Sequence, residues 1–561
     1  MQNIDLIFLW HMHQPDYRDH TADGEFVLPW VYLHAIKDYA DMATHLELHP
    51  KVRAVVNFVP VLLEQIEDYA DQCARSHWRD PLLRLLATPE NTPLGNAERK
   101  HILEACFLAN HEKMLAPFPD YQRLHTLSET LGTAKERDEG PDYFSDAYYF
   151  DLLVWYHLAW SGESARRSEP LLQTMIKKGR GFDRADRDAL LEWIGRTLRE
   201  LIPRYRALAE RGQIELTATP QTHPLAPLLL DIAVGRETQP NAPQPTATAY
   251  PGGAERVERH IAAAQISHAD RFGVAPVGMW PAEGAISSAL VKQFAAAGVR
   301  WIASGEGVLG NSLHKAGMHV LHPAWQPWQL EGAPGLTMFF RDEHLSDLIG
   351  FEYSKWHSGD AAHHFVEQVK NTATLAPEDG RRPMVAVMLD GENAWEYYPY
   401  NGWYFFEELY GLLEKHTAIH TMTFSERLHA QQEEPAVLPV LVAGSWVYGT
   451  LSTWIGDPAK NRAWDLLIAA KQAYDTHIDA LAPEQKIAAE KQLAVCESSD
   501  WFWWFGDYNP GPSVQSFDRL YRRNLANLYH RLLLKPPTEL DTPISGGGGS
   551  AEGGGTMRRA S

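Results

Sequence analysis

The chain has 561 residues, of which 45% are hydrophobic and 22% charged, and its formal net charge is −21. This length predicts one large domain accompanied by one or two smaller ones. The acidic balance disfavours a nucleic-acid partner, which would require a basic surface, and no apolar run approaches the roughly 20 residues of a membrane helix.

The N-terminus and the cysteines bear on the cellular compartment. The stretch MQNIDLIFLW lacks the basic flank of a signal peptide, and Asp5 interrupts its short apolar run. Cys73, Cys106 and Cys496 form an odd count without metal-ligand spacing, which favours a reducing environment over a disulfide framework. We therefore expect a soluble, cytoplasmic protein without membrane contact, and the sequence leaves its oligomeric state open.

Short runs of apolar, β-branched and aromatic residues recur along the first 430 residues and alternate with helical patterns. The clear runs cover 4–10, 53–59, 214–219, 277–280, 299–304, 336–340 and 384–389, and a weaker one covers 421–424. Strands that alternate with helices predict a parallel sheet buried on both faces. Seven clear runs favour a closed β/α barrel over an open doubly wound sheet, and no glycine-rich dinucleotide fingerprint follows the first run.

Helical patterns interrupt this series and then follow it. Between about residues 60 and 210, apolar residues recur at three- and four-residue spacing, so we expect a helical insert in a barrel domain of residues 1–430. Residues 431–545 are mostly helical in pattern, which predicts a C-terminal domain docked on the barrel. Residues 546–561, GGGGSAEGGGTMRRAS, are expected to form a flexible, tag-like tail.

Ionisable residues follow five of the predicted strands, at the point where each strand ends. They are His11 and His13, His223, Glu283, the run Arg341-Asp342-Glu343-His344, and Asp390 with Glu392. In β/α barrels the active site is built at the carboxyl ends of the strands. We therefore expect these side chains to meet at the mouth of the barrel.

Two of these carboxylates lie on different strands in similar surroundings. Glu283 follows Trp280-Pro281 and precedes Gly284, and Asp390 ends an apolar run. Glycoside hydrolysis needs two carboxyl groups, one of which protonates the leaving oxygen. Glu283 and Asp390 are the predicted pair, although either carboxylate taken alone could be a helix cap or a surface group.

His11 and His13 lie two positions apart in a strand, so both can point into the barrel mouth. The pattern has three readings: hydrogen bonding to substrate hydroxyls, metal binding as in metal-dependent amidohydrolases, and a structural histidine at the rim. An amidohydrolase would also require a strand-end lysine and two further histidines, which the sequence does not place.

Aromatic residues are abundant, with 19 Trp, 22 Tyr and 20 Phe. Flat rings beside polar groups suit the faces of sugars. The candidate sugar-binding rings are Trp280, Trp395, Tyr398, Tyr400, Trp446 and Trp501. Asp500 and Trp501, in the segment 496–512, could reach over the barrel mouth, or the rings of that segment could anchor the helical domain.

Five short blocks follow one another along the chain. They are His-Gln-Pro (13–15), Gly-Gln-Ile-Glu (212–215), Trp-Pro-x-Glu (280–283), Asp-Gly-Glu-Asn (390–393) and Ser-x-Asp-Trp (498–501). Together, over about residues 5 to 510, they resemble glycoside hydrolase family 57. The resemblance implies an incomplete (β/α)7 barrel followed by a helical segment, an α-glucan substrate, a retaining mechanism, no metal and no other cofactor.

By this resemblance Glu283 is the nucleophile and Asp390 the general acid/base, and His11 and His13 bind the reacting sugar. The mechanism also requires a raised pKa for Asp390, and Glu392 is expected either to supply the negative charge that raises it or to hold a histidine in place. The full set of expected substrate-binding residues is His11, His13, Gln14, Glu215, His223, Trp280, Glu392, Trp395, Tyr398, Trp446, Asp500 and Trp501.

The stretch Asp-Gly-Glu-Asn-x-Trp-Glu-Tyr-Tyr resembles the amylase and amylopullulanase branch of the family. Branching enzymes typically carry Asp-x-Glu-Leu-Phe-Gly-His-Trp at this place. The resulting hypothesis is hydrolysis of α-1,4 bonds in starch, glycogen or maltooligosaccharides. The alternatives are a 4-α-glucanotransferase or branching enzyme with the same site, a metal-dependent hydrolase, and a glucan-binding protein without catalysis. Substrate length and the preference for α-1,4 or α-1,6 bonds stay open.

Overall fold

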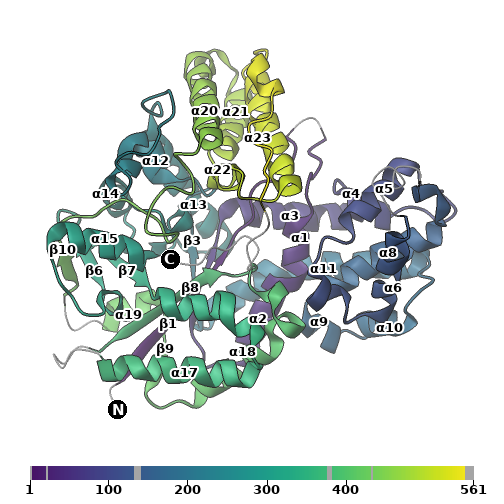
Figure 1. Ribbon diagram of the computed structural model, residues 1–561, viewed down its shortest axis with the longest axis horizontal. Helices are drawn as coiled ribbons and strands as arrows, with labels where there is room; N and C mark the ends of the chain where they lie inside the picture. The colour runs from purple at the N-terminus through teal and green to yellow at the C-terminus, as the bar shows by residue number, and fades with distance from the viewer. Residues whose placement is uncertain (1–2, 21–22, 132–139, 376–381, 431–433, 550–561) are drawn as a thin grey trace.

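A computed structural model describes residues 3–20, 23–131, 140–375, 382–430 and 434–549. Its centre is one mostly parallel sheet. The strands are β1 (Ile4–Met12), β2 (Ala54–Phe58), β3 (Ile214–Ala218), β4 (Gly278–Met279), β5 (Trp301–Gly305), β6 (Trp328–Leu330), β7 (Thr337–Arg341), β8 (Met384–Asp390), β9 (Ile419–Thr421) and β10 (Ala436–Leu438). Seven of them, β1 to β5, β7 and β8, form an incomplete (β/α)7 barrel (Figure 1).

The strand order explains why the barrel is incomplete. The sheet runs β10-β6-β7-β5-β4-β3-β2-β1-β8, and β9 extends it beside the start of β1. In the part of the chain that the structure describes, no ladder joins β7 to β8. Instead, the amide of Asp342 donates to the carbonyl of Ala386 at 2.8 Å, and Arg341 Nε donates to the carbonyl of Met388 at 2.9 Å.

Side chains of the barrel strands alternate between two apolar layers, because successive residues of a strand point to opposite faces. Leu6, Phe8 and Trp10 of β1 pack outward against the helices, whereas Ile7 and Leu9 pack into the barrel interior. Val55, Trp301, Phe339, Ala386 and Met388 belong to the same interior cluster. The interior is therefore a packed apolar core. We call the inward-pointing residues of a strand its inner row, and the residue that follows the last apolar member of such a row lies at the mouth of the barrel.

All seven clear strand predictions are confirmed by β1 to β5, β7 and β8. The weak run at 421–424 is only partly a strand, because β9 covers Ile419–Thr421. The sequence missed β6 and β10, which are three residues long and pair with each other at the edge of the sheet. Strands this short carry too few alternating positions to give a period-two pattern.

The helices of the N-terminal half include the expected insert, since α3 to α11 all lie between β2 and β3 (Figure 1). The α-helices up to β3 are α1 (Trp30–His34), α2 (Ala40–Leu48), α3 (Pro60–Arg75), α4 (Pro81–Leu86), α5 (Asn96–Ala105), α6 (Pro119–Glu129), α8 (Asp146–Ala159), α9 (Glu163–Ser168), α10 (Pro170–Lys178) and α11 (Arg184–Glu210).

The later helices surround the rest of the barrel, and α20 to α23 gather into a bundle at the top of the view in Figure 1. They are α12 (Ala226–Leu230), α13 (Gly253–Phe272), α14 (Ser288–Ala296), α15 (Glu306–Ala316), α16 (Glu343–Asp347), α17 (Ser358–Leu375), α18 (Trp403–Lys415), α19 (Phe424–Ala430), α20 (Pro458–His477), α21 (Pro483–Cys496), α22 (Ser499–Trp504) and α23 (Gly511–Arg531). Among the described residues, no helix is both long and apolar enough to cross a membrane.

The tail predicted over 546–561 lies mostly outside the described residues. Its first four residues, 546–549, are described and contact the protein, since the amides of Gly548 and Gly549 both donate to the carbonyl of Asn509 at 3.1 Å. The domain boundaries at 430 and 545 remain predictions.

A buried ionic cluster joins the C-terminal helices to the barrel. Glu497, fully buried at the end of α21, accepts hydrogen bonds from Arg256 Nη2 (2.7 Å) and His260 Nε2 (2.8 Å), both on α13. Burial opposes ionisation of Glu497, but the charge and hydrogen bonds of Arg256 and His260 outweigh it and lower the pKa of Glu497. The carboxylate is therefore ionised and paired.

We predict that Glu497→Ala destabilises the protein by about 3–5 kcal/mol, because it leaves the buried Arg256 charge without its partner. Urea unfolding followed by tryptophan fluorescence measures the effect. The control is Arg206→Ala, which removes an exposed pair with Glu210 and should cost less than about 0.5 kcal/mol. Equal losses in the two variants would contradict a docking role for Glu497.

Candidate active site

A cavity of about 610 Å³ lies at the carboxyl ends of the barrel strands. Its wall combines strand ends, the region that precedes α1, the insert and the C-terminal helices. Nine of the predicted site residues line it: His11, His13, Gln14, His223, Glu283, Asp390, Glu392, Trp446 and Asp500. The structure thus brings the predicted catalytic pair and most of the predicted polar residues to one cavity.

Asp390 reaches the mouth because it is the last residue of the inner row of β8, after Ala386 and Met388. It lies in register with His11 of β1. Glycine at the next position lets Met12 pack closely, because a Cβ on Gly391 would lie 2.0 Å from Met12 Sδ and would force that side chain to move. The Gly391 amide donates to the His11 carbonyl at 2.7 Å and fixes this approach.

The surroundings of Asp390 favour its protonated form. Burial raises the pKa of Asp390 to about 6, while a hydrogen bond from Asn393 Nδ2 (2.9 Å) and the nearby His13 and Arg341 oppose the rise. The negative charge of Asp500 adds to it. A carboxyl group with a pKa near 6 can hold a proton and release it close to neutral pH.

Glu283 is held in a tight turn after the short strand β4. Its backbone is left-handed, with φ of 60°, and Gly284 follows with φ of 56°. Non-glycine residues rarely adopt this conformation, and strain of this kind gathers at functional sites. The Trp446 ring Nε1–H donates to Glu283 Oε2 at 3.0 Å, and the Trp446 amide donates to the Glu283 carbonyl at 3.1 Å. The loop after β10 therefore fixes the carboxylate.

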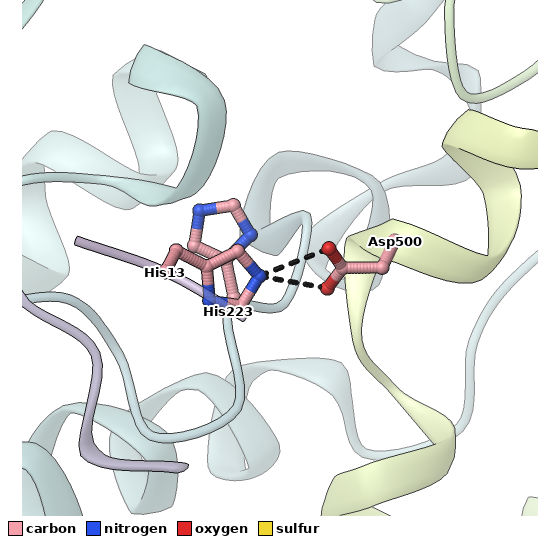
Figure 2. A group of neighbouring side chains, drawn as sticks. All are labelled: His13, His223 and Asp500. Atoms are coloured by element: carbon pink, nitrogen blue, oxygen red, sulfur yellow. Dashed lines mark hydrogen bonds and ion pairs between the residues drawn. The ribbon is translucent and has the colours of Figure 1, made fainter. Parts of the chain in front are cut away.

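Three histidines stack along one side of the cavity. The rings of His13 and His223 stack on each other (Figure 2), with their centroids 3.8 Å apart and an angle of 19° between them. The ring of His11 stacks 5.1 Å from that of His223. Burial, together with the mutual repulsion of the rings, lowers the pKa of His11 to about 3 and that of His223 well below its usual value. His11 and His223 are therefore neutral near pH 7.

Neutral rings form one continuous hydrogen-bond chain. His11 Nδ1–H donates to Asn57 Oδ1 at 2.7 Å, so His11 Nε2 accepts from His223 Nε2–H at 3.1 Å. His223 Nδ1 then accepts from the Ser499 hydroxyl at 2.8 Å. With Asn57 in this orientation, each of the two rings donates once and accepts once.

His13 and Asp500 form a pair between the barrel and α22. His13 Nε2 lies 2.9 Å from both carboxylate oxygens of Asp500, as the dashed lines in Figure 2 mark. With His223 they offer ligand atoms within 4.8 Å of one another, which is close enough for a metal site. However, imidazole lone pairs lie in the ring plane, and those of the stacked His13 and His223 run nearly parallel instead of converging on one ion. The arrangement does not suit a metal without rotation of a ring.

Glu392 lies in the wall of the cavity but is only 2% exposed. Its Oε1 accepts from the His13 amide (3.3 Å) and from Gln14 Nε2 (3.2 Å). Burial and the nearby charge of Asp390 raise the pKa of Glu392 well above its usual value. Glu392 is therefore a neutral acid that holds the His13-Gln14 turn.

Five predicted substrate-binding residues do not line the cavity, so direct contact with a ligand is not supported for them. Trp280, Trp395, Tyr398 and Trp501 are at most 2% exposed, and the latter three donate to backbone carbonyls of Gly391, Ile349 and Val495 respectively. Glu215 lies at the amino end of β3, where its carboxylate accepts from Trp301 Nε1 (2.7 Å) and from the Ser425 amide (2.9 Å). Tyr400 also lies off the cavity wall and is exposed.

The cavity also has walls that the sequence did not assign as binding residues. Besides Arg341, they include Trp30, Phe107, Asn110, Trp160, Tyr397, Trp503, Trp504 and Phe517. Trp503 and Trp504 follow Trp501 on the helix α22, and a helix turns neighbouring side chains about 100° apart, so one ring is core and the others face the cavity. In the segment 496–512, polar residues beside the tryptophans indicate that some of these rings could face a ligand. The sequence of the insert contains no such indication for residues 107–110, which also line the cavity.

Comparisons with solved structures found three enzymes of the same fold. The chain resembles the crystal structure of a branching enzyme from Pyrococcus horikoshii at 15% identity, over 96% of this chain and 93% of that one, with a TM-score of 0.59. An α-amylase from Thermotoga maritima matches at 14% identity, over 96% and 95%, with a TM-score of 0.56. A 4-α-glucanotransferase from Thermococcus litoralis matches at 15% identity, over 96% and 61%, with a TM-score of 0.53.

At these identities the likeness establishes the fold alone, and the search of curated proteins found no match. The family model for glycosyl hydrolase family 57 matches residues 7–441, which span β1 to β10 and contain both predicted catalytic carboxyl groups. The chain therefore belongs to glycosyl hydrolase family 57.

Proposed function

We propose that the protein is an α-glucan-active glycoside hydrolase that cleaves α-1,4 bonds with retention of anomeric configuration. The observation that carries the proposal is the placement of Glu283 and Asp390 in one cavity with aromatic walls. Rings such as Trp446, Trp503 and Trp504 suit the flat faces of glucose units. The membership in family 57 and the fold shared with an α-amylase support the same substrate class.

The proposed reaction has two steps. In the first, a carboxylate oxygen of Glu283 attacks C1 of the bound glucose, and the bond from C1 to the leaving oxygen breaks. Asp390 donates its proton to that oxygen, so the shortened glucan departs with a free hydroxyl. In the second, Asp390 takes a proton from water as the water oxygen attacks C1 and releases Glu283.

The electrostatics of the two carboxyl groups suit these roles. The Trp446 ring N–H fixes one oxygen of Glu283 in the position it needs for attack. Burial holds the pKa of Asp390 at about 6, so Asp390 carries the proton that the leaving oxygen requires in mildly acidic solution. The pair of His13 and Asp500 gives hydrogen-bonding groups for the hydroxyls of the same sugar.

Transfer to a sugar acceptor is the second candidate function, because a hydroxyl of another glucan can replace water in the second step. This candidate is supported by the fold that the chain shares with a 4-α-glucanotransferase and a branching enzyme. Incubation with amylose, pullulan and maltooligosaccharides, followed by product sizing and a reducing-sugar assay, separates the two. Hydrolysis raises reducing ends in proportion to cleavage, whereas transfer redistributes chain lengths without raising them.

We expect Glu283→Gln to lower kcat on amylose by roughly 10³-fold or more, because the amide cannot form the glycosyl intermediate. The matched control is Glu306→Gln, which changes a carboxyl group after β5 that does not line the cavity. The control should keep most of the activity. Unchanged activity in Glu283→Gln would show that Glu283 is not the nucleophile.

The anomer released first from maltooligosaccharides tests the stereochemistry. Double displacement inverts C1 twice, so the new reducing end is the α anomer before mutarotation. Proton NMR during the first minutes of reaction distinguishes the anomers. Release of the β anomer would replace the proposed mechanism with single displacement.

The alkaline limb of the pH profile reports Asp390. We expect kcat/KM to fall above about pH 6, because the acid loses its proton as the pH rises through its pKa. Asn393 donates to the ionised carboxylate and opposes the raised pKa, so Asn393→Ala should shift the limb upward by roughly half to one unit. The control is Asn110→Ala, another cavity-lining asparagine, whose side chain accepts from the Lys113 amide and not from a group of Asp390. An unmoved limb in Asn393→Ala would count against Asp390 as the acid.

A further inference from the structure

A group of aromatic side chains lies at the surface and does not line the cavity. Tyr400 is 53% exposed and Tyr404 is 48% exposed, while Trp403 between them is half-buried. The rings of Tyr400 and Tyr404 lie 5.4 Å apart and nearly perpendicular, at 87°. We call Tyr400, Trp403, Tyr404 and the neighbouring Arg167 the tyrosine patch.

The backbone that presents Tyr400 is strained. Tyr400 and Asn401 have φ of 54° and 53°, a conformation that costs non-glycine residues free energy. At Asn401 two buried hydrogen bonds offset the cost of this conformation. The side-chain amide accepts from Lys37 Nζ and donates to Asp41 Oδ2, both at 2.9 Å. Among the described residues the Tyr400 side chain forms no comparable hydrogen bond, and it is 53% exposed. Strain that is held by its surroundings is a pointer to function.

A cation completes the tyrosine patch with a polar edge. The Arg167 guanidinium lies 5.1 Å from the Trp403 ring and 5.0 Å from the Tyr404 ring, and its Nη2 donates to the Tyr404 hydroxyl at 3.0 Å. Glu163 holds Arg167 from the other side through a hydrogen bond of 2.8 Å. The patch is thus preorganised, with ring faces beside hydrogen-bonding groups, which is the combination that sugars require.

The tyrosine patch is continuous along the chain with the cavity wall. Glu396 and Tyr397 line the cavity, and Tyr400 follows three residues later on the same loop between β8 and α18. A polymer bound in the cavity extends past its rim, so its next units pass over nearby surface.

We propose that the tyrosine patch is a second binding site for α-glucan polymers, outside the catalytic cavity. The proposal rests on the proposed function, because it takes the occupant of the patch to be the same polymer that the cavity cleaves. A surface site raises the effective concentration of polymer at the cavity and does nothing for substrates too short to span both. The patch therefore acts on long chains alone.

The test compares polymer and short substrates in matched variants. The double variant Tyr400→Ala/Tyr404→Ala removes both rings, and Tyr400→Phe/Tyr404→Phe keeps the rings without the hydroxyls. Tyr143→Ala, which changes a tyrosine that is 82% exposed on the insert side, is the control. Retardation in native gels containing glycogen measures binding, and kinetics on glycogen and maltotriose measure turnover.

We expect the double alanine variant to lose most of its retardation by glycogen and to show a KM for glycogen raised roughly five- to tenfold, with kcat and KM on maltotriose unchanged. The phenylalanine variant should stay close to the wild type, as should Tyr143→Ala. Unchanged retardation and KM in the double alanine variant would overturn the proposal.

Two other outcomes would also overturn it. Equal losses on glycogen and maltotriose would mean that the rings act through the cavity. A changed elution volume in gel filtration without sugar would mean that the patch is an interface between copies of the chain. If the wild type turned over no α-glucan, the proposed function would fail, and retardation by glycogen would still decide whether the patch binds the polymer.

Discussion

The packed interior of the barrel is the constraint on which the site depends. Parallel strands buried on both faces have one inner row each, and the apolar residues of those rows fill the barrel. The register of β1 with β8 then sets His11 beside Asp390 at the top of adjacent rows. Asn57 of β2 is in register with His11, and Thr219 lies two residues beyond Thr217, the register partner of Asn57 on β3. Thr219 and His11 both donate to Asn57 Oδ1.

Burial at this level decides the charge of each group. Without water, ionised side chains are costly, so His11, His223 and Glu392 are held neutral by their surroundings. Asp390 is the intermediate case, because the Asn393 amide and nearby cations offset part of its burial. Asp390 thus holds an exchangeable proton beside three groups, His11, His223 and Glu392, that stay neutral near pH 7.

The C-terminal helices complete this site. Three residues between positions 497 and 500 connect them to the barrel: Glu497 pairs with Arg256, Ser499 donates to His223, and Asp500 binds His13. The same helix, α22, supplies Trp503 and Trp504 to the cavity wall. A barrel without these helices would keep Glu283 and Asp390, the proposed catalytic carboxyl groups, but would lose the contacts that hold His13 and His223.

The sequence by itself determined the seven barrel strands, the predicted carboxyl pair and the histidines, because alternation of apolar residues and strand-end position are local properties of the chain. It did not distinguish Trp501 from Trp503, since both lie in one aromatic run and only the packing of α22 decides which ring is core. It also assigned Glu215 to the site, although that residue is on the inner face at the opposite end of its strand. Which rings meet a ligand was decided by tertiary structure alone, because exposure depends on what packs against each ring from elsewhere in the chain.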